Sequence, residues 1–219
     1  MKRILAGLLV ITLLIVALPS LFMLAESGAP IEGDVRFQTY EGKINAPEFP
    51  SGLDWINTDK PLKLSDLKGK IVLLDFWTYG CINCYHIIPD LHKLEAEFPN
   101  ELVVIGVHSA KFSNERNTEN IRRITQRYGI THPVVNDSRF QIWDSYTVKA
   151  WPTVVLIDPL GKILGYQAGE GIYENPQPIV NGMIGEFQGR SLLNSTPITF
   201  SPAEAQQATP LALSRQSAS

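Results

Sequence analysis

The stretch IVLLDFWTYGCINCYHIIPDL, Ile71 to Leu91, contains both cysteines of the chain, Cys81 and Cys84. Its first part, Ile71–Trp77, is almost continuously apolar, which is typical of a strand buried on both faces. From Cys84 onward, apolar residues recur at helical spacing, and Pro89 lies inside the predicted helix. The order strand, Cys-x-x-Cys, helix predicts a pair of thiols at the start of a helix.

The position of the two thiols suggests their chemistry. Cys81 falls at or just before the first helical turn, where free amide hydrogens and the helix dipole stabilise a thiolate, so it is the candidate nucleophile. Cys84 lies about one turn further on, and we expect it to be buried and to attack a mixed disulfide formed at Cys81. The alternative of a structural staple is weak, because so short a bridge closes almost no loop.

Asp75 is the third candidate catalytic residue. It interrupts the most apolar strand of the chain, where burial should raise the pKa of a carboxyl group. Such a group could accept the proton of Cys84. The alternative is a strand-end aspartate that reaches solvent or caps a neighbour.

The rest of the body alternates between predicted strands and helices, which indicates an α/β fold with a central sheet flanked by helices. Further strands are predicted at 102–107, 134–135, 153–157 and 163–166, the last two joined as a hairpin through Asp158–Gly161. Further helices are predicted at 115–128, 140–146 and 179–187. Residues 46–60 should form an irregular cover or an edge hairpin. The charged cluster 111–123 should be a solvated helix face.

Composition narrows the class of protein. The 219 residues have a net charge of -3 and a pI near 5.8, which gives no electrostatic footprint for nucleic acid. A hydrophobic content of 44% with 19% charged residues fits a globular body. Two cysteines are too few for a disulfide-rich secreted scaffold.

The N-terminus has the pattern of a membrane segment. Lys2 and Arg3 precede the apolar run 4–25, which is as long as the roughly 20 residues that a spanning helix needs. We expect an uncleaved signal anchor, with a cleaved signal peptide as the alternative. Either one places the body outside the cytoplasm, where disulfides are permitted. The expected organisation is an anchor or signal at 1–25, a tether at 26–45, a domain at 46–189 and a flexible tail at 190–219.

The motif Asp75-Phe76-Trp77-x-x-x-Cys81-x-x-Cys84, with Pro152 before a later strand and hairpin, resembles thioredoxins. It is most similar to the membrane-tethered extracytoplasmic thiol–disulfide oxidoreductases, and the likeness runs from about residue 46 to 187. Five blocks in register resemble the thioredoxin-like domain of the NHL repeat-containing protein 2 type: GLDWIN (52–57), TYGCINC (78–84), IGVHSAKF (105–112), ITHPVVND (130–137) and WPT (151–153).

The resemblance implies a thioredoxin-like fold with a mixed central sheet, and it implies roles for several residues. Pro152 would be cis and packed against the cysteine pair, Trp151 would offer backbone groups to a substrate, and Asp75 would match the buried acid. From its place beside the pair, Tyr79 is expected to shape the entrance to Cys81. Trp77, the last candidate of the substrate-binding group, is expected to pack behind the active turn.

This chain departs from that family in two respects. Members often carry a further cysteine at the position of Gly80, so chemistry that needs a third thiol is not implied here. Members also continue into an NHL β-propeller, for which this chain has no room. The chain could therefore be a truncated form or a stand-alone relative.

The residues around the pair fit other functions of a Cys-x-x-Cys motif less well. Haem attachment is not expected, because Tyr85 separates the cysteine pair from His86. A zinc site would need two histidine ligands besides the two thiols, but His86 and His92 lie on different faces of the helix. A copper carrier would need one histidine ligand besides the thiols. His108 and His132 are more often loop or edge residues than ligands.

Two other functions remain open. Thr78 stands three residues before Cys81, as in peroxiredoxins, but Leu74 replaces their proline, so a thiol peroxidase is an alternative. A non-catalytic docking module is another. The favoured interpretation is a thiol–disulfide oxidoreductase that acts on protein substrates without a metal or organic cofactor. A redox partner protein is implied, because two thiols turn over only once unaided.

Overall fold

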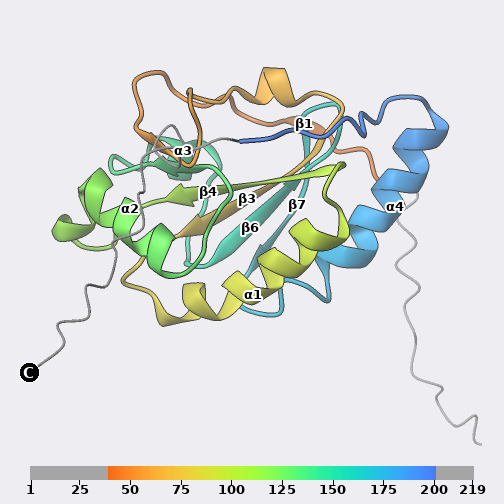
Figure 1. The fold of residues 1–219 in the computed structure, drawn as a ribbon. Coiled ribbons are helices and arrows are strands. Elements are labelled where there is room, and N and C mark those ends of the chain that lie inside the picture. The colour runs from red at the N-terminus through yellow and green to blue at the C-terminus, as the bar shows by residue number, and fades with distance from the viewer. Residues whose placement is uncertain (1–38, 201–219) are drawn as a thin grey trace, which may run out of the picture. The chain divides into compact units, whose positions relative to one another are not determined.

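The structure is a computed structural model that describes residues 39–200. Within this range the strands form one mixed sheet in the order β1-β7-β6-β3-β4-β5-β2 (Figure 1). The strands are β1 (Ile44–Asn45), β2 (Trp55–Ile56), β3 (Ile71–Trp77), β4 (Leu102–His108), β5 (Val134–Asn136), β6 (Thr153–Ile157) and β7 (Lys162–Ala168). The helices are α1 (Ile82–Glu97), α2 (Thr118–Arg127), α3 (Gln141–Ser145) and α4 (Pro176–Gly189), and short 3-10 helices span Leu64–Leu67 and Ser113–Arg116.

β3 is the centre of the sheet. It pairs in parallel with β4 and antiparallel with β6, and all seven of its residues are buried. A strand covered on both faces needs apolar side chains at successive positions, which is what the run Ile71–Trp77 supplies. The predicted hairpin is confirmed, because β6 and β7 pair antiparallel across the turn at Asp158–Gly161.

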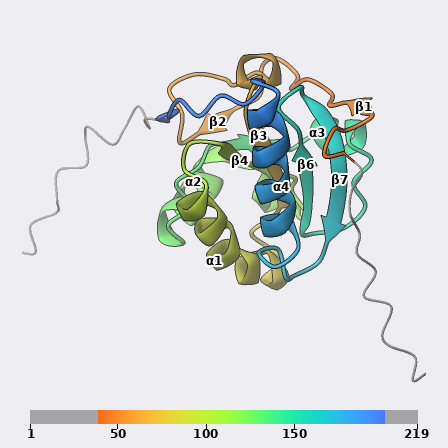
Figure 2. The same ribbon diagram turned by 90° about the vertical axis from the view of Figure 1, so that its right-hand side faces the viewer.

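Alternate residues of β3 face two different cores. Ile71 and Leu73 pack among residues of α1 and α4, whereas Leu74 and Phe76 pack on the other side with residues of α3. Figures 1 and 2 show the same division, with α1 and α4 side by side on one face of the sheet and α3 on the other. The predicted α/β architecture, a mixed sheet flanked by helices, is confirmed.

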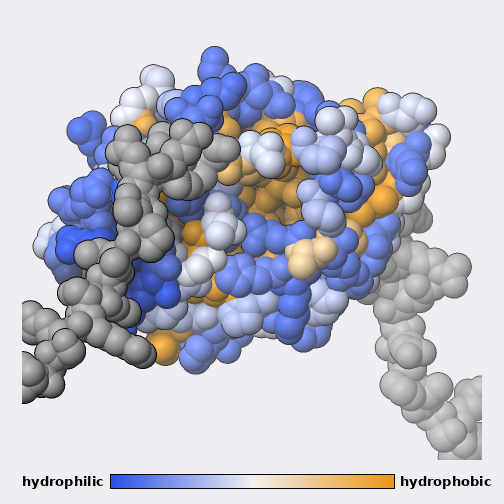
Figure 3. All heavy atoms as spheres, in the orientation of Figure 1, coloured by the Kyte–Doolittle hydropathy of each residue, from blue (hydrophilic) through white to orange (hydrophobic). Residues whose placement is uncertain are grey.

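α1 carries the cysteine pair into the fold. It begins immediately after Cys81, its N-cap residue, and buries one stripe that includes Cys84, Ile87 and Leu91 against the sheet. Its other side faces solvent, and Figure 3 shows a largely polar surface over α1, with apolar atoms visible in a hollow above it. Pro89 lies inside the helix, as predicted, and cannot donate a backbone hydrogen bond there.

The two ends of the described range join the sheet and its cores. The predicted tether (26–45) is described only from residue 39, and its last residues form β1, which pairs with β7. The predicted tail starts at residue 190, yet its first residues lie on the body. The Asn194 N–H donates to the Gly69 carbonyl (2.7 Å), the Thr196 carbonyl accepts from the buried Lys70 ammonium (2.5 Å), and Phe200 packs against the α3 core.

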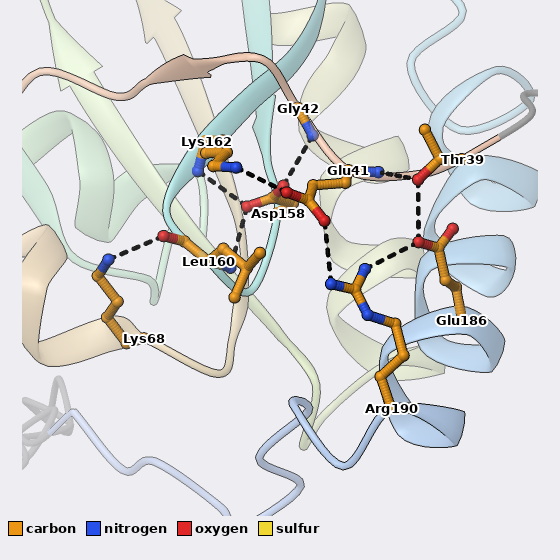
Figure 4. A network of polar contacts seen from close by, with 9 residues as sticks. All are labelled: Thr39, Glu41, Gly42, Lys68, Asp158, Leu160, Lys162, Glu186 and Arg190. Atoms are coloured by element: carbon orange, nitrogen blue, oxygen red, sulfur yellow. Dashed lines mark hydrogen bonds and ion pairs between the residues drawn. The ribbon is translucent and has the colours of Figure 1, made fainter.

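A polar network fastens the first described residues to the far end of the sheet (Figure 4). Buried Asp158 accepts hydrogen bonds from the backbone N–H groups of Gly42, Leu160 and Lys162 at 2.8–2.9 Å. Glu41 pairs with Lys162 (2.6 Å) and with Arg190 of the α4 end (3.0 Å). These contacts hold residues 39–42 against the β6–β7 hairpin and α4.

Other elements of the structure differ from the prediction in their bounds or in the strand with which they pair. Residues 46–60 form no hairpin, because Trp55–Ile56 (β2) pairs with β5 at the sheet edge instead. The predicted helix 115–128 is two elements, a 3-10 turn followed by α2, whose N-cap Asn117 accepts from the Asn120 N–H. No helix of residues 39–200 is both long and apolar enough to cross a membrane, and the anchor predicted at 4–25 lies outside this range.

Candidate functional site

Cys81 lies where β3 gives way to α1. As the N-cap of α1 it has extended backbone angles, φ -124° and ψ 113°, and its side chain is partly exposed. Its thiol donates to the Trp151 carbonyl, with Sγ 3.8 Å from the oxygen. The Trp151–Pro152 peptide bond is cis, which confirms the prediction for Pro152. The turn before β6 therefore lies directly against the first thiol.

Cys84 lies beneath the surface, one turn into α1. Its side chain is only 2% exposed, and both cysteines are free thiols in this structure. Burial is the main cause that raises the pKa of the Cys84 thiol, and the hydrogen bond with Cys81 and the charge of Asp75 raise it further. Cys84 consequently needs a base before it can react as a thiolate.

Asp75 is a buried acid close to that thiol. It is 4% exposed, and its Oδ1 atom has no hydrogen-bond partner among the described residues. Burial raises the pKa of Asp75 from its ordinary value of 3.8 to about 7, while the charge that His132 can carry opposes the rise. The alternative of a solvent-exposed strand-end aspartate is wrong. A carboxyl group that titrates near neutrality can exchange a proton with Cys84.

The turn between β3 and α1 is braced by Glu115. This residue is 1% exposed and accepts hydrogen bonds from the Thr78 hydroxyl and from the Lys111 N–H (2.9 Å). A side-chain carbon added to Gly80 would overlap the Glu115 carboxylate. The prediction of a solvated charged face is therefore wrong for Glu115, which fills the space beside the turn.

His108 supports the same turn from the end of β4. Its Nε2 accepts the backbone N–H of Tyr79 at 3.3 Å, and its ring contacts those of Tyr79 and Trp77. Burial lowers the pKa of His108 to about 3, so the imidazole is neutral at physiological pH. It therefore acts as a hydrogen-bond acceptor that fixes Tyr79.

Aromatic and apolar side chains surround the pair. The Trp151 ring packs on Trp143, with centroids 4.4 Å apart, and the Tyr79 hydroxyl donates to the Asn114 carbonyl at 2.8 Å. Ile82, next to Cys81, is 66% exposed, and Phe112, which borders Gly80, is 54% exposed. Exposed apolar residues of this size mark the region beside Cys81 as a candidate contact surface.

Comparisons with known proteins identify the family to which this fold belongs. A family model described as thioredoxin-like matches residues 69–163. The thiol-disulfide oxidoreductase ResA of Bacillus subtilis is 34% identical over 136 residues, which cover 59% of this chain and 72% of ResA. The chain belongs to the thioredoxin-like family.

Other relatives are closer in sequence but much longer. Human NHL repeat-containing protein 2 is 50% identical over 135 residues, 60% of this chain and 19% of that protein. The chloroplastic protein SUPPRESSOR OF QUENCHING 1 of Arabidopsis thaliana is 47% identical over 154 residues, 69% of this chain and 14% of that protein. This chain therefore spans less than a fifth of either relative. Among solved structures, the thioredoxin-like superfamily protein SPOA0173 superposes with a TM-score of 0.59 at 24% identity, covering 64% of this chain and 97% of that one, a likeness of fold.

Within this thioredoxin-like domain, most candidate site residues come together. Cys81, Cys84, Tyr79 and Trp151 belong to one cluster around the start of α1. Trp77 belongs to it too, but it is 2% exposed and lies behind the turn, where it does not line the surface. Among residues 39–200, no three side chains of the metal-binding types gather into a site.

Two buried residues next to the site were given no place in it from the sequence. Glu115 lies 37 positions after Thr78, inside a run of charged residues that resembles an ordinary helix surface. His132 was expected at a loop or edge, and it does precede β5, but it is buried and paired with Glu95 of α1. The available signal was weak in both cases, since each partner is distant in sequence. The one available signal was Asp75 itself, since a carboxyl group in a buried strand predicts a polar neighbour elsewhere in the chain.

Proposed function

We propose that this domain is a thiol–disulfide oxidoreductase that exchanges a dithiol for a disulfide with protein substrates. The observation that carries the proposal is the paired arrangement of the thiols. Cys81 is partly exposed at the N-cap of α1 and against the turn with cis Pro152, and Cys84 is buried below it. The likeness to ResA, whose name states such an activity, supports the same chemistry.

In the reducing direction, the Cys81 thiolate attacks one sulfur of a substrate disulfide. The substrate S–S bond breaks, the first substrate sulfur leaves as a thiolate, and a mixed disulfide joins Cys81 to the substrate. Cys84 then gives its proton to the Asp75 carboxylate and attacks the Cys81 sulfur. The second substrate thiolate leaves, and a Cys81–Cys84 disulfide remains. A dithiol partner protein must reduce that disulfide before another turnover, and oxidation of a substrate is the same sequence in reverse.

The substrate surface would be formed by residues around Cys81. The hydrogen bond from the Cys81 thiol to the Trp151 carbonyl supports this, because it brings the backbone beside Pro152 next to the thiol that a substrate must reach. Tyr79 and the exposed Ile82 and Phe112 border the same thiol. The apolar border favours protein substrates with exposed apolar side chains.

The N-terminal pattern supports a place outside the cytoplasm for this activity. Lys2 and Arg3 before the apolar run 4–25 favour a membrane tether, or a removed signal, that delivers domain 46–189 across a membrane. A thiol pair that cycles through a disulfide suits an oxidising compartment. Nucleic acid is not an expected partner, since the net charge is -3.

The test is a redox titration of the purified protein in glutathione buffers, read by alkylation and mass. The native protein should show one two-electron couple, and a single midpoint potential should describe it. Cys84→Ser should keep a reactive thiol and trap mixed disulfides with substrate proteins. Cys81→Ser should lose rapid reaction with substrate, because the remaining Cys84 is buried.

Two results, obtained from the titration together with binding and peroxide assays, would contradict the proposal. A native protein without a reversible couple, combined with partner binding that survives both serine variants, would indicate a docking module instead. Rapid turnover of peroxide with no exchange of protein disulfides would indicate a thiol peroxidase. The structure gives peroxidase activity little support, because Thr78 is fully buried and its hydroxyl donates a hydrogen bond to Glu115.

A further inference from the structure

We propose that His132 and Glu95 form a proton exit that connects Asp75 with solvent. The inference rests on the proposed function, since it concerns the proton that Cys84 gives up during disulfide exchange. It assigns a role to two residues outside the Cys-x-x-Cys motif, one before β5 and one on α1. Both act on the reacting sulfur through Asp75, so they are positioning and relay residues.

The first observation is an ion pair at the rim of the core. The Nδ1 atom of His132 lies 3.1 Å from Oε1 of Glu95. The His132 side chain is 4% exposed, whereas that of Glu95 is 26% exposed, so the pair leads from the interior towards the surface. When Nδ1 carries a hydrogen that it donates to Glu95, Nε2 of the neutral ring is left as an acceptor that faces inward.

The second observation is the space over Gly106. Gly106 pairs with Asp75 in the parallel β3–β4 ladder, so its missing side chain would lie on the same face of the sheet as the Asp75 carboxyl. A carbon added to Gly106 would be 3.0 Å from Trp77 Nε1 and 3.6 Å from His132 Nε2. Val134 Cγ2 would be equally close at 3.0 Å, so glycine at this position lets Trp77 Nε1 and His132 Nε2 approach the β4 backbone beside Asp75.

Two polar atoms without a hydrogen-bond partner in the described part of the chain belong to alternate residues of β3 and therefore lie on the same face of the sheet. Asp75 Oδ1 and Trp77 Nε1 are both buried and have no hydrogen-bond partner among the described residues. Buried polar atoms are nearly always satisfied, and a site lined by several of them is suited to one internal water. A proton can then pass from the Asp75 carboxyl to His132 Nε2, directly or through such a water.

The third observation is an outlet on the far side of the ion pair. Glu95 and His132 both line a surface cavity of about 280 Å³, together with Pro99 of the turn after α1 and Ile198 and Phe200 of the C-terminal segment. The cavity gives the outer end of the relay access to solvent. The path from Asp75 therefore passes through a buried imidazole to a partly exposed carboxylate.

The proton steps balance as follows. Cys84 loses its proton to the Asp75 carboxylate and becomes the attacking thiolate. The Asp75 carboxyl then gives a proton to Nε2 of His132, and the imidazolium releases its Nδ1 proton through Glu95 to solvent. Asp75 is again a carboxylate, His132 is left as its Nε2–H tautomer, and the net change is one proton lost from Cys84. When the Cys81–Cys84 disulfide is reduced again, a proton passes along the same path in the opposite direction and restores the Nδ1–H tautomer of His132.

The titratable groups around this path come from three strands or their ends and one helix. They are Asp75 on β3, His108 at the end of β4, His132 before β5, and Cys84, His92 and Glu95 on α1. His108 is neutral near pH 7, since burial lowers its pKa to about 3. His132 is the group whose charge opposes the rise in the pKa of Asp75, so it couples the acid to its surroundings.

The test uses a single turnover of the reduced protein with dithiobis(nitrobenzoate), which releases a coloured thiolate at each step. The first release reports attack by Cys81, and the second reports attack by Cys84 on the mixed disulfide. His132→Gln should slow the second release about tenfold below about pH 7 and shift its pH midpoint upward. This loss is smaller than the roughly 10²–10⁴-fold contribution of a general base, because Asp75 itself is retained. The first release should keep its rate. Added imidazole buffer should restore the second release in the variant and leave the native protein unchanged.

The matched control is His86→Gln. His86 forms an ion pair of the same kind, 3.1 Å from Glu170, but both side chains are about half exposed at the surface. Its two releases should match those of the native protein. Glu95→Gln should slow only the second release, and by less than His132→Gln.

The outcomes separate this inference from the proposed function. An unchanged second release in His132→Gln, or equal slowing of both releases in that variant, would overturn the proton exit. If the second release in Glu95→Gln has the native rate, Glu95 does not belong to the proton relay. Failure of the native protein to give any second release would instead contradict the proposed function, since Cys84 would not be resolving the mixed disulfide.

Discussion

Asp75 destabilises the folded state in two ways, by the burial of its carboxyl group and by the lack of a hydrogen-bond partner for one oxygen within the described range. Its carboxyl group is almost completely buried, and one of its oxygens has no partner among residues 39–200. Burial accordingly raises the pKa of Asp75 to about 7. The folded protein binds a proton at Asp75 more tightly than the unfolded chain does, so this residue makes stability depend on pH.

The first prediction concerns that dependence in Asp75→Asn. Between the ordinary pKa of 3.8 and the folded value of about 7, the native protein should lose stability as pH rises, because only the folded state retains the proton. Above that window the contribution is constant. The variant lacks the ionisation, so it should gain up to about 4 kcal/mol relative to the native protein between about pH 4 and about pH 8.

Urea unfolding at several pH values measures this difference. The buried amide of the variant has its own cost, but that cost is the same at every pH, so the slope of the difference is the quantity to compare. A stability difference that stays constant across the range would show that Asp75 titrates in the folded state as it does in the unfolded chain.

At this scale the sequence was informative where the signal is local. Cys81, Cys84 and Asp75 are within ten positions of one another, and the strand and helix around them determine which is exposed and which is buried. Glu115 and His132 could not be identified in the same way. Their importance depends on contacts with Thr78 and Glu95, each 37 positions away, and nothing in the local pattern distinguishes them from surface residues.

The turn between β3 and α1 shows how one element depends on another. Thr78 and Gly80 are fixed by Glu115, a residue of the 3-10 helix that follows β4. Glycine is required here by space, since the carboxylate occupies the volume of a side chain at position 80.

The second prediction is that Gly80→Ala destabilises the protein by about 1–3 kcal/mol, the usual cost of overpacking. The added methyl group forces the buried Glu115 carboxylate to move away from Thr78. Thermal unfolding and the rate of Cys81 alkylation should both change. In a Glu115→Ala background the same substitution should cost less, because the overlapping carboxylate is gone.

Gly185→Ala is the control for this change. Gly185 lies in α4 with open space where its Cβ would be, so alanine should add up to about 1 kcal/mol of stability through its better helix propensity. Equal effects of Gly80→Ala in the native and Glu115→Ala backgrounds would mean that Glu115 does not determine the packing of the turn.

Whole elements were predicted most accurately where burial is complete. The bounds of β3 and β6 match the prediction residue for residue, because an apolar run between turn signals leaves few alternatives. The pairing of Trp55–Ile56 with β5 could not be predicted, since two residues at a sheet edge carry almost no pattern. The same holds for β1, whose place beside β7 depends on the network around Asp158.

At the scale of the whole domain, the two ends of β6 have different tasks. Pro152 precedes its first residue beside Cys81, and Asp158 follows its last residue in the network of Figure 4. A strand of five residues separates these ends by about 17 Å. Stability and reactivity can therefore be changed separately.

The third prediction uses that separation. Asp158→Ala should cost about 3 kcal/mol, because it removes a buried acceptor from the N–H groups of Gly42, Leu160 and Lys162. Calorimetry should show a lower Tm, while the alkylation rate of Cys81 in the folded protein should stay the same. Lys68→Ala, which removes an exposed hydrogen bond to Leu160 in the same network, should change the Tm little. Similar Tm values for the two variants would show that the network does not hold the domain together.

The depth difference between the two sulfurs also bears on oxidative damage. An oxidant that reaches the surface meets Cys81 and converts it to a sulfenic acid, while Cys84, at 2% exposure, is shielded. Condensation with the sheltered neighbour then forms the disulfide and expels water before a second oxidising equivalent can generate the irreversible sulfinic form. Burial of one thiol thus lets the domain recover from an encounter that would permanently inactivate a solitary cysteine.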